Sequence, residues 1–134
     1  MAKIRYFISG TMLLLALLSG CINPAKQPGE GKYADVTVSE GKQMIDSGDI
    51  FILDVRTKEE YDTGHIKGSI LIPLQEIEKR YNEIPRDRKI LVYCKTGHRS
   101  TQASEILVKN GFKQIYNMKG GITEWTKAGY EIIK

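Results

Sequence analysis

The hydrophobic residues of this chain form short continuous runs, which alternate with segments where hydrophobic residues recur every three or four positions. Continuous apolar runs of strand length, such as residues 50–53, are typical of parallel strands that are buried on both faces of a sheet. The pattern predicts strands at residues 34–38, 50–53, 70–72 and 90–93, and a last short strand within residues 112–118.

The segments between these runs predict helices. Ser39 has the position of an N-cap for a helix that ends near Gly48, and Thr57 with Glu60 has the spacing of a capping box. Further helices are predicted at residues 58–62, 75–81, 100–110 and around 122–125. Strands that alternate with helices predict an α/β fold in which a central parallel sheet is flanked by helices on both faces.

The first 21 residues do not belong to this pattern. Lys3 and Arg5 precede an apolar run at residues 12–18, and small residues follow it. A basic start, an apolar segment of roughly 7–15 residues and a small-residue end predict a signal peptide. The alternative is an uncleaved transmembrane helix, but that requires about 20 apolar residues and polar residues interrupt this segment.

The end of the signal segment, Leu18–Cys21, resembles the lipobox of bacterial lipoproteins. The resemblance implies that Cys21 is acylated and becomes the mature N-terminus, which places the protein at the extracytoplasmic face of the cell membrane. Residues 22–33, rich in Pro and Gly, then form a flexible tether, and residues 34–134 form one domain. The alternative is ordinary cleavage near Gly20, which leaves an unmodified Cys21.

Charge and composition exclude some partners. The 134-residue chain has a net charge of +4. Removal of Lys3 and Arg5 lowers the Lys+Arg count from 20 to 18 against 16 Asp+Glu, so the mature chain is nearly neutral. There is no Lys/Arg run or aromatic-basic interleaving, so nucleic acid is not an expected partner. No His/Cys cluster has metal-ligand spacing, and no cofactor is expected.

The chain has two cysteines, Cys21 and Cys94. If Cys21 carries lipid, Cys94 has no partner for an intramolecular disulfide, and an odd cysteine in an exported protein indicates a reactive thiol. The alternatives are a disulfide between the two cysteines and an inert, buried Cys94.

Cys94 lies at the carboxyl end of a predicted strand, where open parallel sheets bind their ligands. The loop after it turns at Gly97 and leads to the predicted helix 100–110. The free backbone N–H groups of a helix N-terminus and a tight loop bind anions, and they lower the pKa of a cysteine thiol. Lys95 and Arg99 add positive charge, so Cys94 is predicted to be a thiolate nucleophile.

The spacing from Cys94 to Arg99 is C-x4-R, one residue shorter than the C-x5-R loop of tyrosine-type phosphatases. A shorter ring of N–H groups suits one additional sulfur atom on the cysteine better than a tetrahedral phosphate. No Asp follows the loop closely enough to serve as the general acid for a phosphate ester.

Four separate motifs resemble those of the single-domain rhodaneses, a family of sulfurtransferases. They are Leu53–Arg56 with Glu60 and Tyr61, Gly64–Ser69, Cys94–Ser100, and Gly120–Ile122 with Trp125. The loop Cys94–Ser100 is the discriminating motif, since it distinguishes active members from those that have lost activity.

The resemblance implies that Cys94 attacks the outer sulfur of an anionic donor such as thiosulfate, and that sulfite leaves. The resulting Cys94 persulfide then passes its sulfur to a thiol or to cyanide, and a protein acceptor is also compatible. It implies further that the loop binds the substrate. The loop residues are Lys95, Thr96, Gly97, His98, Arg99 and Ser100.

Other polar residues near the site have two interpretations each. Asp54 and Arg56 are expected to pair and fix the end of their strand, although Arg56 can instead pair with Glu60. His65 is expected to brace its turn. Arg99 either contacts substrate or pairs with a carboxylate, and His98 has a side chain that faces either substrate or solvent.

Two other functions remain open from the sequence. One is a rhodanese-like binding module that presents or receives sulfur for a neighbouring protein with little turnover. The other is a phosphatase or arsenate reductase.

Overall fold

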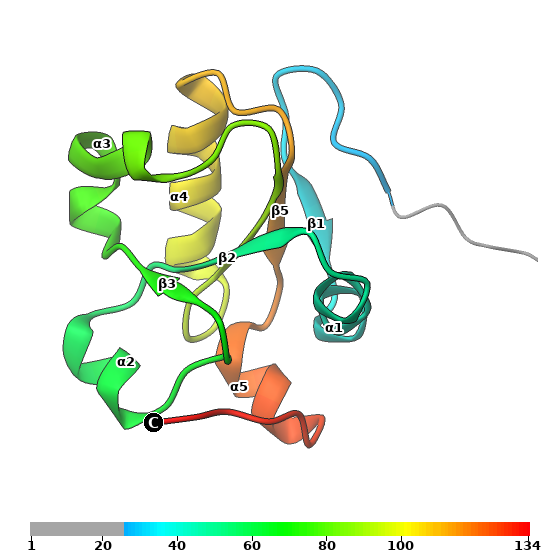
Figure 1. The fold of residues 1–134 in the computed structure, drawn as a ribbon, viewed down its shortest axis with the longest axis vertical. Coiled ribbons are helices and arrows are strands. Elements are labelled where there is room, and N and C mark those ends of the chain that lie inside the picture. The colour runs from blue at the N-terminus through cyan, green and yellow to red at the C-terminus, as the bar shows by residue number, and fades with distance from the viewer. Residues whose placement is uncertain (1–25) are drawn as a thin grey trace, which may run out of the picture.

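A computed structural model describes residues 26–134 (Figure 1). The predicted signal peptide, the predicted lipidation site Cys21 and the first residues of the predicted tether lie outside the described residues. The described chain forms a five-stranded parallel sheet in the order β1-β5-β4-β2-β3. The strands are β1 (Ala34–Val36), β2 (Ile50–Asp54), β3 (Ile70–Leu71), β4 (Lys89–Tyr93) and β5 (Ile115–Met118).

Helices cover both faces of the sheet, as the sequence predicts. The helices are α1 (Val38–Asp46), α2 (Lys58–Thr63), α3 (Ile77–Arg80), α4 (His98–Lys109) and α5 (Gly121–Lys127). Short 3-10 turns, η1 (Leu74–Glu76) and η2 (Tyr81–Glu83), flank α3. Figure 1 shows α3 and α4 on one side of the strands and α1 on the other, and the core residues of α5 belong to the α1 side.

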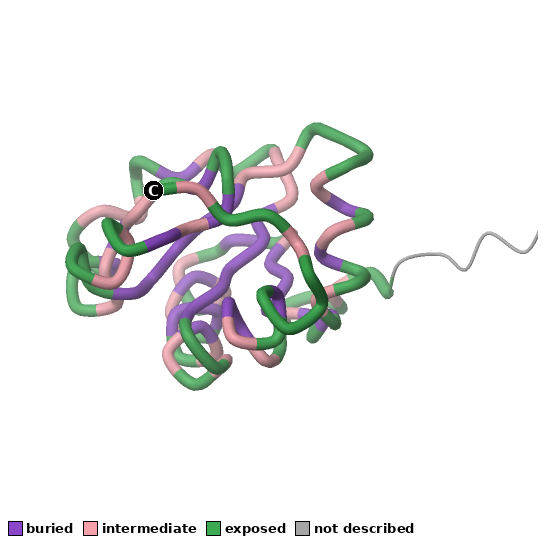
Figure 2. Tube along the Cα trace, turned by 90° about the horizontal axis from the view of Figure 1, so that it is seen from below, coloured by how far each residue is buried: buried purple, intermediate pink, exposed green. Residues whose placement is uncertain are grey.

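The central strand β4 explains why the strand sequences read as unbroken apolar runs. Ile90 and Val92 pack toward α3 and α4, whereas Leu91 and Tyr93 pack toward α1 and α5. All four side chains are buried, and Figure 2 shows the buried residues concentrated along the strands, with exposed residues on the surrounding segments. A strand with a core on each face requires apolar residues at every position.

Some predicted boundaries were wrong at helix starts. Helix α1 is capped by Thr37, whose side chain forms a capping box with Glu40, and not by Ser39. Thr37 also ends β1, which is two residues shorter than predicted. The capping box predicted for Thr57 and Glu60 at the start of α2 is confirmed.

The other boundary differences have local causes. Helix α4 begins at His98, two residues before the predicted start, because Gly97 serves as its N-cap with a φ of 104°. The predicted helix 75–81 is split into η1, α3 and η2, and such tightening to 3-10 geometry is common in short helical segments. Strand β5, Ile115–Met118, lies within the segment 112–118 where a short strand is predicted, and the turn out of α4 ends before it, at residues 110–111.

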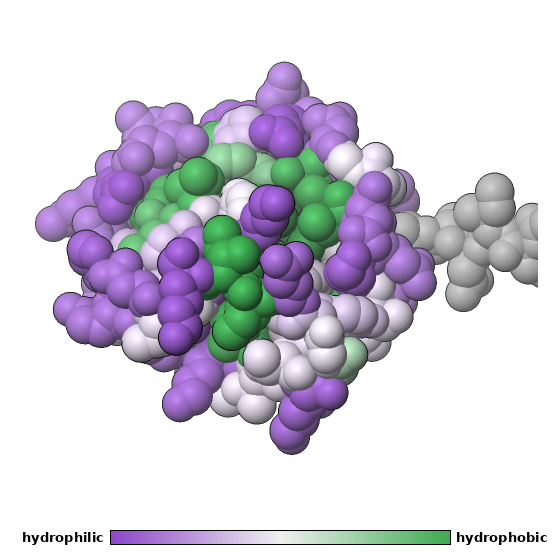
Figure 3. All heavy atoms as spheres, turned by 60° about the horizontal axis from the view of Figure 1, so that its bottom comes forward, coloured by the Kyte–Doolittle hydropathy of each residue, from purple (hydrophilic) through white to green (hydrophobic). Residues whose placement is uncertain are grey.

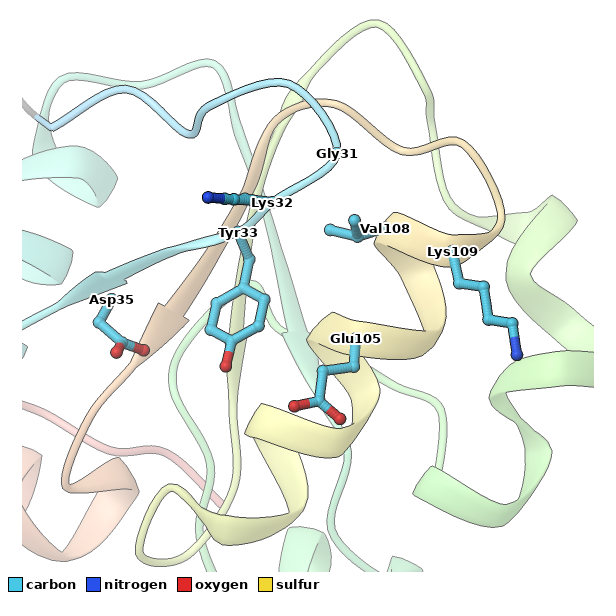
Figure 4. Close-up of a pocket in the computed structure, with 7 residues that line it drawn as sticks. All are labelled: Gly31, Lys32, Tyr33, Asp35, Glu105, Val108 and Lys109. Carbon is cyan, nitrogen blue, oxygen red and sulfur yellow. The ribbon is translucent and has the colours of Figure 1, made fainter.

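The last residues of the predicted tether lie against the domain. Tyr33 packs against the core on the α4 side. It also lines an open pocket of about 530 Å³ with Glu105 and Val108 of α4 (Figure 4). The folded part of the chain therefore includes Tyr33. Within the described residues, no helix combines the length and apolar character needed to cross a membrane.

Two fully buried tyrosines differ in their hydrogen bonding. The Tyr93 hydroxyl accepts a hydrogen bond from Ile66 N at 3.1 Å and donates one to Ser69 Oγ at 3.1 Å. The Tyr116 hydroxyl is also buried but has no hydrogen-bond partner among residues 26–134. The Tyr93 hydroxyl therefore pairs with a buried backbone donor, whereas the Tyr116 hydroxyl pairs with no group that the structure describes.

This difference predicts opposite results for the same substitution. Tyr93→Phe leaves the Ile66 N–H unpaired, so we expect the free energy of unfolding to fall by about 1–3 kcal/mol. Tyr116→Phe removes an unpaired polar atom, so the free energy of unfolding should stay the same or rise. Urea denaturation of the two variants measures both values, and equal losses would contradict the hydrogen-bond assignment.

Candidate active site

Cys94 directly follows β4, and β4 lies between β5 and β2 in the sheet. The thiol is therefore at the carboxyl edge of the sheet, where the sequence predicts a ligand site. Asp54, the last residue of β2, lies at the same edge and pairs in register with Tyr93. Figure 3 shows this end of the molecule, where apolar atoms are surrounded by hydrophilic side chains.

The sulfur of Cys94 is held inside its own loop. Gly97 N–H donates to Cys94 Sγ at 3.1 Å, and the Ser100 hydroxyl lies 3.6 Å from the same sulfur. Cys94 is only 1% exposed. The residue touches the core between the sheet and α4, but its sulfur contacts the polar groups of the loop.

Two opposing effects act on the pKa of the Cys94 thiol. Burial raises the pKa, because it penalises the charged thiolate. Hydrogen bonds from the Ser100 side chain and from the backbone N–H groups of Ser100, Gly97 and Thr96 lower it, and they outweigh burial. The pKa of Cys94 therefore lies below its ordinary value, which favours the thiolate.

The N-terminus of α5 supports the loop from behind. Ile122 N donates to Cys94 O at 2.9 Å, and Thr123 N donates to Lys95 O at 3.1 Å. The peptide bonds of residues 26–134 include no cis bond, so each N–H that follows these carbonyls points in the opposite direction, away from α5. The contact with α5 therefore holds the carbonyl groups of Cys94 and Lys95 toward the outside of the loop. The N–H groups that follow them point to the interior of the loop.

This support requires glycine at position 121. Gly121 has a φ of 58°, and a Cβ there would lie 2.4 Å from both Cys94 O and Lys95 O. Any side chain would separate α5 from the loop. Gly121, which belongs to the rhodanese-like motif Gly120–Ile122, therefore acts at the back of the site.

Gly97 leaves the first turn of α4 free for an anion. Most N-caps accept hydrogen bonds from that turn with a side chain, but glycine has none, and no side chain caps α4. The backbone N–H groups at the start of α4 therefore remain available beside the sulfur.

Arg99 pairs with a carboxylate. Its Nη1 and Nη2 atoms lie 2.7 Å and 2.8 Å from the two carboxylate oxygens of Glu60 on α2. Glu60 also accepts from Thr57 N at 3.0 Å as part of the capping box. Of the two interpretations of Arg99, the structure shows pairing with a carboxylate, and this ion pair connects the loop to α2.

Asp54 and Arg56 form the expected ion pair at the end of β2. Arg56 Nη2 lies 2.7 Å from Asp54 Oδ2 and donates to Gly64 O at 2.7 Å, and both charged side chains are buried. The alternative pairing of Arg56 with Glu60 was wrong, because Arg99 occupies that carboxylate.

The remaining predicted residues fall into two groups: one stabilises the turn after α2, and the other lies at the mouth of the loop. His65 Nδ1 lies 2.9 Å from Tyr61 O, the two rings stack, and the His65 backbone pairs with Ile133. These contacts hold the turn after α2 against the C-terminal segment. The exposed residues at the mouth of the loop are Lys95, Thr96 and His98.

The comparison with known families agrees with this site. A family model for the rhodanese-like domain matches residues 37–128. This chain belongs to the rhodanese family. The match covers four of the five strands, β2 to β5, together with the loop Cys94–Ser100 and all of α5.

Two relatives show the range of names within this family. The putative sulfur carrier protein YrkF of Bacillus subtilis (strain 168) is 41% identical over 93 residues. That alignment covers 69% of this rhodanese chain but only 50% of YrkF. A protein named sulfurtransferase from Allochromatium vinosum is 35% identical over 95 residues, which are 71% of this chain and 89% of the relative.

A solved structure has the same fold. A rhodanese-related protein from Thermoplasma volcanium superposes with a TM-score of 0.70 and 33% identity, over 75% of this chain and 98% of that one. The names of the two relatives above indicate sulfur transfer at the level of this family. Among residues 26–134, no group of three or more His, Cys, Asp and Glu side chains is placed to hold a metal ion.

Two features of this rhodanese site were absent from the sequence prediction. The Glu60–Arg99 pair joins residues 39 positions apart, so no local spacing indicates it. Asn117 and Thr101 also contact the loop region, but a lone buried amide on a strand and a threonine on a helix carry no motif. Only the tertiary structure brings these groups together.

The Glu60–Arg99 pair predicts a pH dependence. The hydrogen bonds from Arg99 lower the pKa of Glu60 from 4.5 to about 2, against the opposing effect of partial burial. Because the pKa is depressed in the folded state, the stabilisation is present above pH 4.5 and is lost as the pH falls toward 2. We expect the urea midpoint of the wild type to fall further between about pH 6 and about pH 3 than that of Glu60→Gln, because the glutamine has no carboxylate to protonate.

Glu59 provides the matched control for this experiment. It lies on the same helical turn, is exposed, and makes no ion pair with the described residues. Glu59→Gln should therefore keep the pH dependence of the wild type. If Glu60→Gln loses stability with acid as steeply as the wild type, the pair does not contribute.

Proposed function

We propose that this rhodanese is a sulfurtransferase that moves a sulfane sulfur through a persulfide on Cys94. The observation that carries the proposal is the hydrogen bond from Gly97 N–H to Cys94 Sγ, at 3.1 Å. It supports a loop whose backbone amides stabilise negative charge on sulfur. The thiolate attacks the outer sulfur of a thiosulfate-like donor, the S–S bond of the donor breaks, and sulfite leaves with its electron pair.

The second half of the cycle returns the enzyme to its starting state. A thiolate acceptor or cyanide attacks the outer sulfur of the persulfide, and the Cys94 thiolate is the leaving group. The Cys94 sulfur gives up its negative charge in the first half and regains it in the second, when the thiolate leaves, so the same amides stabilise the charged sulfur at the start and at the end of the cycle. The lowered pKa of Cys94 makes it a good nucleophile and a good leaving group.

The burial of Cys94 and the charges at the loop mouth favour a small anionic donor. With Cys94 only 1% exposed, the reacting sulfur of the donor must be terminal and enter the loop alone. The exposed side chains of Lys95 and His98 stand at the entrance, and Lys95 attracts an anion. Thiosulfate, polysulfide and a persulfide on a partner protein share these properties.

The phosphatase and arsenate reductase alternatives have less support. Those reactions need an arginine that clamps two oxygens of a tetrahedral anion. The Arg99 guanidinium already forms two hydrogen bonds with Glu60. A free guanidinium is therefore missing from the loop of this chain.

A sulfur carrier with little turnover is the second candidate. It is favoured by the name of the 41% identical relative, a putative sulfur carrier protein, and by the burial of Cys94, which limits free acceptors. Both candidates require the same Cys94 persulfide, but only the sulfurtransferase releases product repeatedly.

Mass spectrometry of the full chain tests the persulfide. Incubation with thiosulfate, polysulfide or a small-molecule persulfide should add one sulfur atom, and Cys94→Ser should abolish the gain. Repeated release of thiocyanate on addition of cyanide indicates the sulfurtransferase, and loading without turnover indicates the carrier. Failure to gain sulfur from every donor, with hydrolysis of an aryl phosphate, would overturn the proposal.

We infer further that the domain is tethered by lipid at Cys21 to the extracytoplasmic face of the cell membrane. The support is the basic, apolar and lipobox pattern of residues 1–21. Stable anchoring needs two acyl chains or an equivalent second signal, as lipoprotein acylation supplies.

Metabolic labelling tests the anchor. Growth with a palmitate analogue should label the wild type and Cys94→Ser alike. The Cys21→Ser protein should carry no label and should be found in the soluble fraction. Label retained by Cys21→Ser would exclude this residue as the lipidation site.

A further inference from the structure

The carbonyl group of Gly97 accepts an unusual number of hydrogen bonds. It accepts from Thr101 N at 3.2 Å, from Thr101 Oγ1 at 2.8 Å and from Ser100 Oγ at 3.1 Å. The peptide group between Gly97 and His98 is trans, so its N–H points away from this carbonyl. Whatever holds the Gly97 carbonyl therefore also fixes the direction of the His98 N–H.

Ser100 cannot hold this carbonyl throughout the reaction. Its hydroxyl has one proton, which the structure directs to Gly97 O. When Cys94 ionises, the same proton can turn to the sulfur 3.6 Å away. The Thr101 hydroxyl, which does not contact the sulfur, then remains as the side-chain donor to Gly97 O.

The direction of the Thr101 hydroxyl is set by Asn117 on β5. Asn117 Nδ2 donates to Thr101 Oγ1 at 3.1 Å, so the single proton of that hydroxyl is free to donate only onward, to Gly97 O. Asn117 is 2% exposed, and its other amide hydrogen is donated to Asp35 Oδ1 at 2.9 Å.

Asp35 fixes the orientation of the Asn117 amide. A carboxylate only accepts hydrogen bonds, so the NH₂ group of Asn117 must face it. The two hydrogens of that group then match the two acceptors, Asp35 and Thr101. Asn117 Oδ1 has no partner among residues 26–134, which shows that the donations of the amide, not its acceptor, hold it in place.

We propose that Thr101 and Asn117 are positioning residues for Cys94. They hold the Gly97 carbonyl on the outer side of the loop, which directs the His98 N–H of the same peptide group inward, and they fix the residue whose own N–H bonds the sulfur. The chain of hydrogen bonds runs from Asp35 at the sheet edge through Asn117 and Thr101 to Gly97, whose own N–H binds the sulfur. The proposal rests on Cys94 as the nucleophile of the proposed function.

The alternative is a purely structural role, in which the same bonds only fasten α4 to β5 and β1. The two roles differ in what they change. A structural contact affects unfolding, whereas a positioning contact changes the reactivity of Cys94 in the folded protein.

Thr101→Val tests the proposal without adding charge. It removes the hydroxyl at nearly constant volume. The readout is the rate of Cys94 alkylation by iodoacetamide across pH, in the full chain with Cys21→Ser so that Cys94 is the only thiol. We expect a roughly three- to tenfold lower rate at neutral pH and a profile shifted to higher pH, as for the loss of one hydrogen bond.

Thr101→Ser and Ser47→Ala are the controls. The serine keeps the hydroxyl and should restore the rate. Ser47, at the end of α1, makes the same kind of bond, from its hydroxyl to the carbonyl of Met44 three residues earlier at 2.8 Å, but it is not linked to the loop. Ser47→Ala should therefore alkylate like the wild type, because it loses a similar bond elsewhere.

Exchanging the carboxylate of Asp35 with the amide of Asn117 separates an effect on the reactivity of Cys94 from an effect on stability. Asn117→Asp places two carboxylates together and gives Thr101 an acceptor in place of a donor, so the hydroxyl turns away from Gly97. Adding Asp35→Asn restores a hydrogen bond between the two strands but still offers Thr101 only an acceptor. We expect the urea midpoint to recover in the double variant while the alkylation rate stays low.

Two outcomes would overturn the positioning role. One is an alkylation rate for Thr101→Val within about twofold of the wild-type rate, which is a smaller change than the loss of one hydrogen bond should produce. The other is recovery of the rate together with stability in the double variant. Alkylation needs no sulfur donor, so absence of sulfur loading in the wild type counts against the proposed function alone.

Discussion

The orientation of the peptide groups between Cys94 and Ser100 is the constraint on which the site depends. The Ser100 hydroxyl is the one side-chain partner of the sulfur in this loop, so the stabilisation of a sulfur anion depends mainly on backbone N–H groups that point inward. Three supports fix that orientation from outside: α5 binds the carbonyls of Cys94 and Lys95, and α4 and β5 hold the carbonyl of Gly97 through Thr101 and Asn117. Each support acts on a carbonyl, and the amides follow because the peptide bond is planar.

The electrostatics of the loop follow from this arrangement. The charge of Arg99 is directed to Glu60, and that of Arg56 to Asp54, so neither guanidinium competes for the sulfur. Fixed backbone dipoles need no reorganisation when charge develops, which suits a reaction with a negative sulfur in both halves. The buried Asp54–Arg56 pair and the partly exposed Glu60–Arg99 pair hold a strand end and a helix around the loop, while Lys95 at the mouth of the loop attracts anions to it.

Much of this molecule could be predicted from local sequence signals. Continuous apolar runs such as Ile50–Leu53 indicate parallel strands because each needs a core on both faces, and Thr57 with Glu60 indicates a helix start because the capping box is local. The place of Cys94 at a strand end, followed by Gly97, was enough to predict an anion-binding loop. The rhodanese motifs added the kind of chemistry.

The unpredicted parts are contacts between distant segments. Arg99 has a nearby carboxylate only because α2 packs beside the loop, and Asn117 meets Thr101 only because β5 lies next to α4. The start of α4 at His98 also escaped prediction, because Gly97 replaces the side-chain cap that sequence patterns rely on. Residues that position a site through the tertiary structure carry no periodicity or spacing of their own.

The most direct measurement is the pH at which Cys94 ionises in the folded wild-type loop. In a Cys21→Ser chain, where Cys94 is the only thiol, thiolate absorbance followed across pH reports that midpoint. Inward amides predict a midpoint clearly below about 8.5, the value of a free cysteine, and its return to that value on unfolding in urea. A folded midpoint at or above about 8.5 would mean that burial prevails and that the amides do not converge on the sulfur.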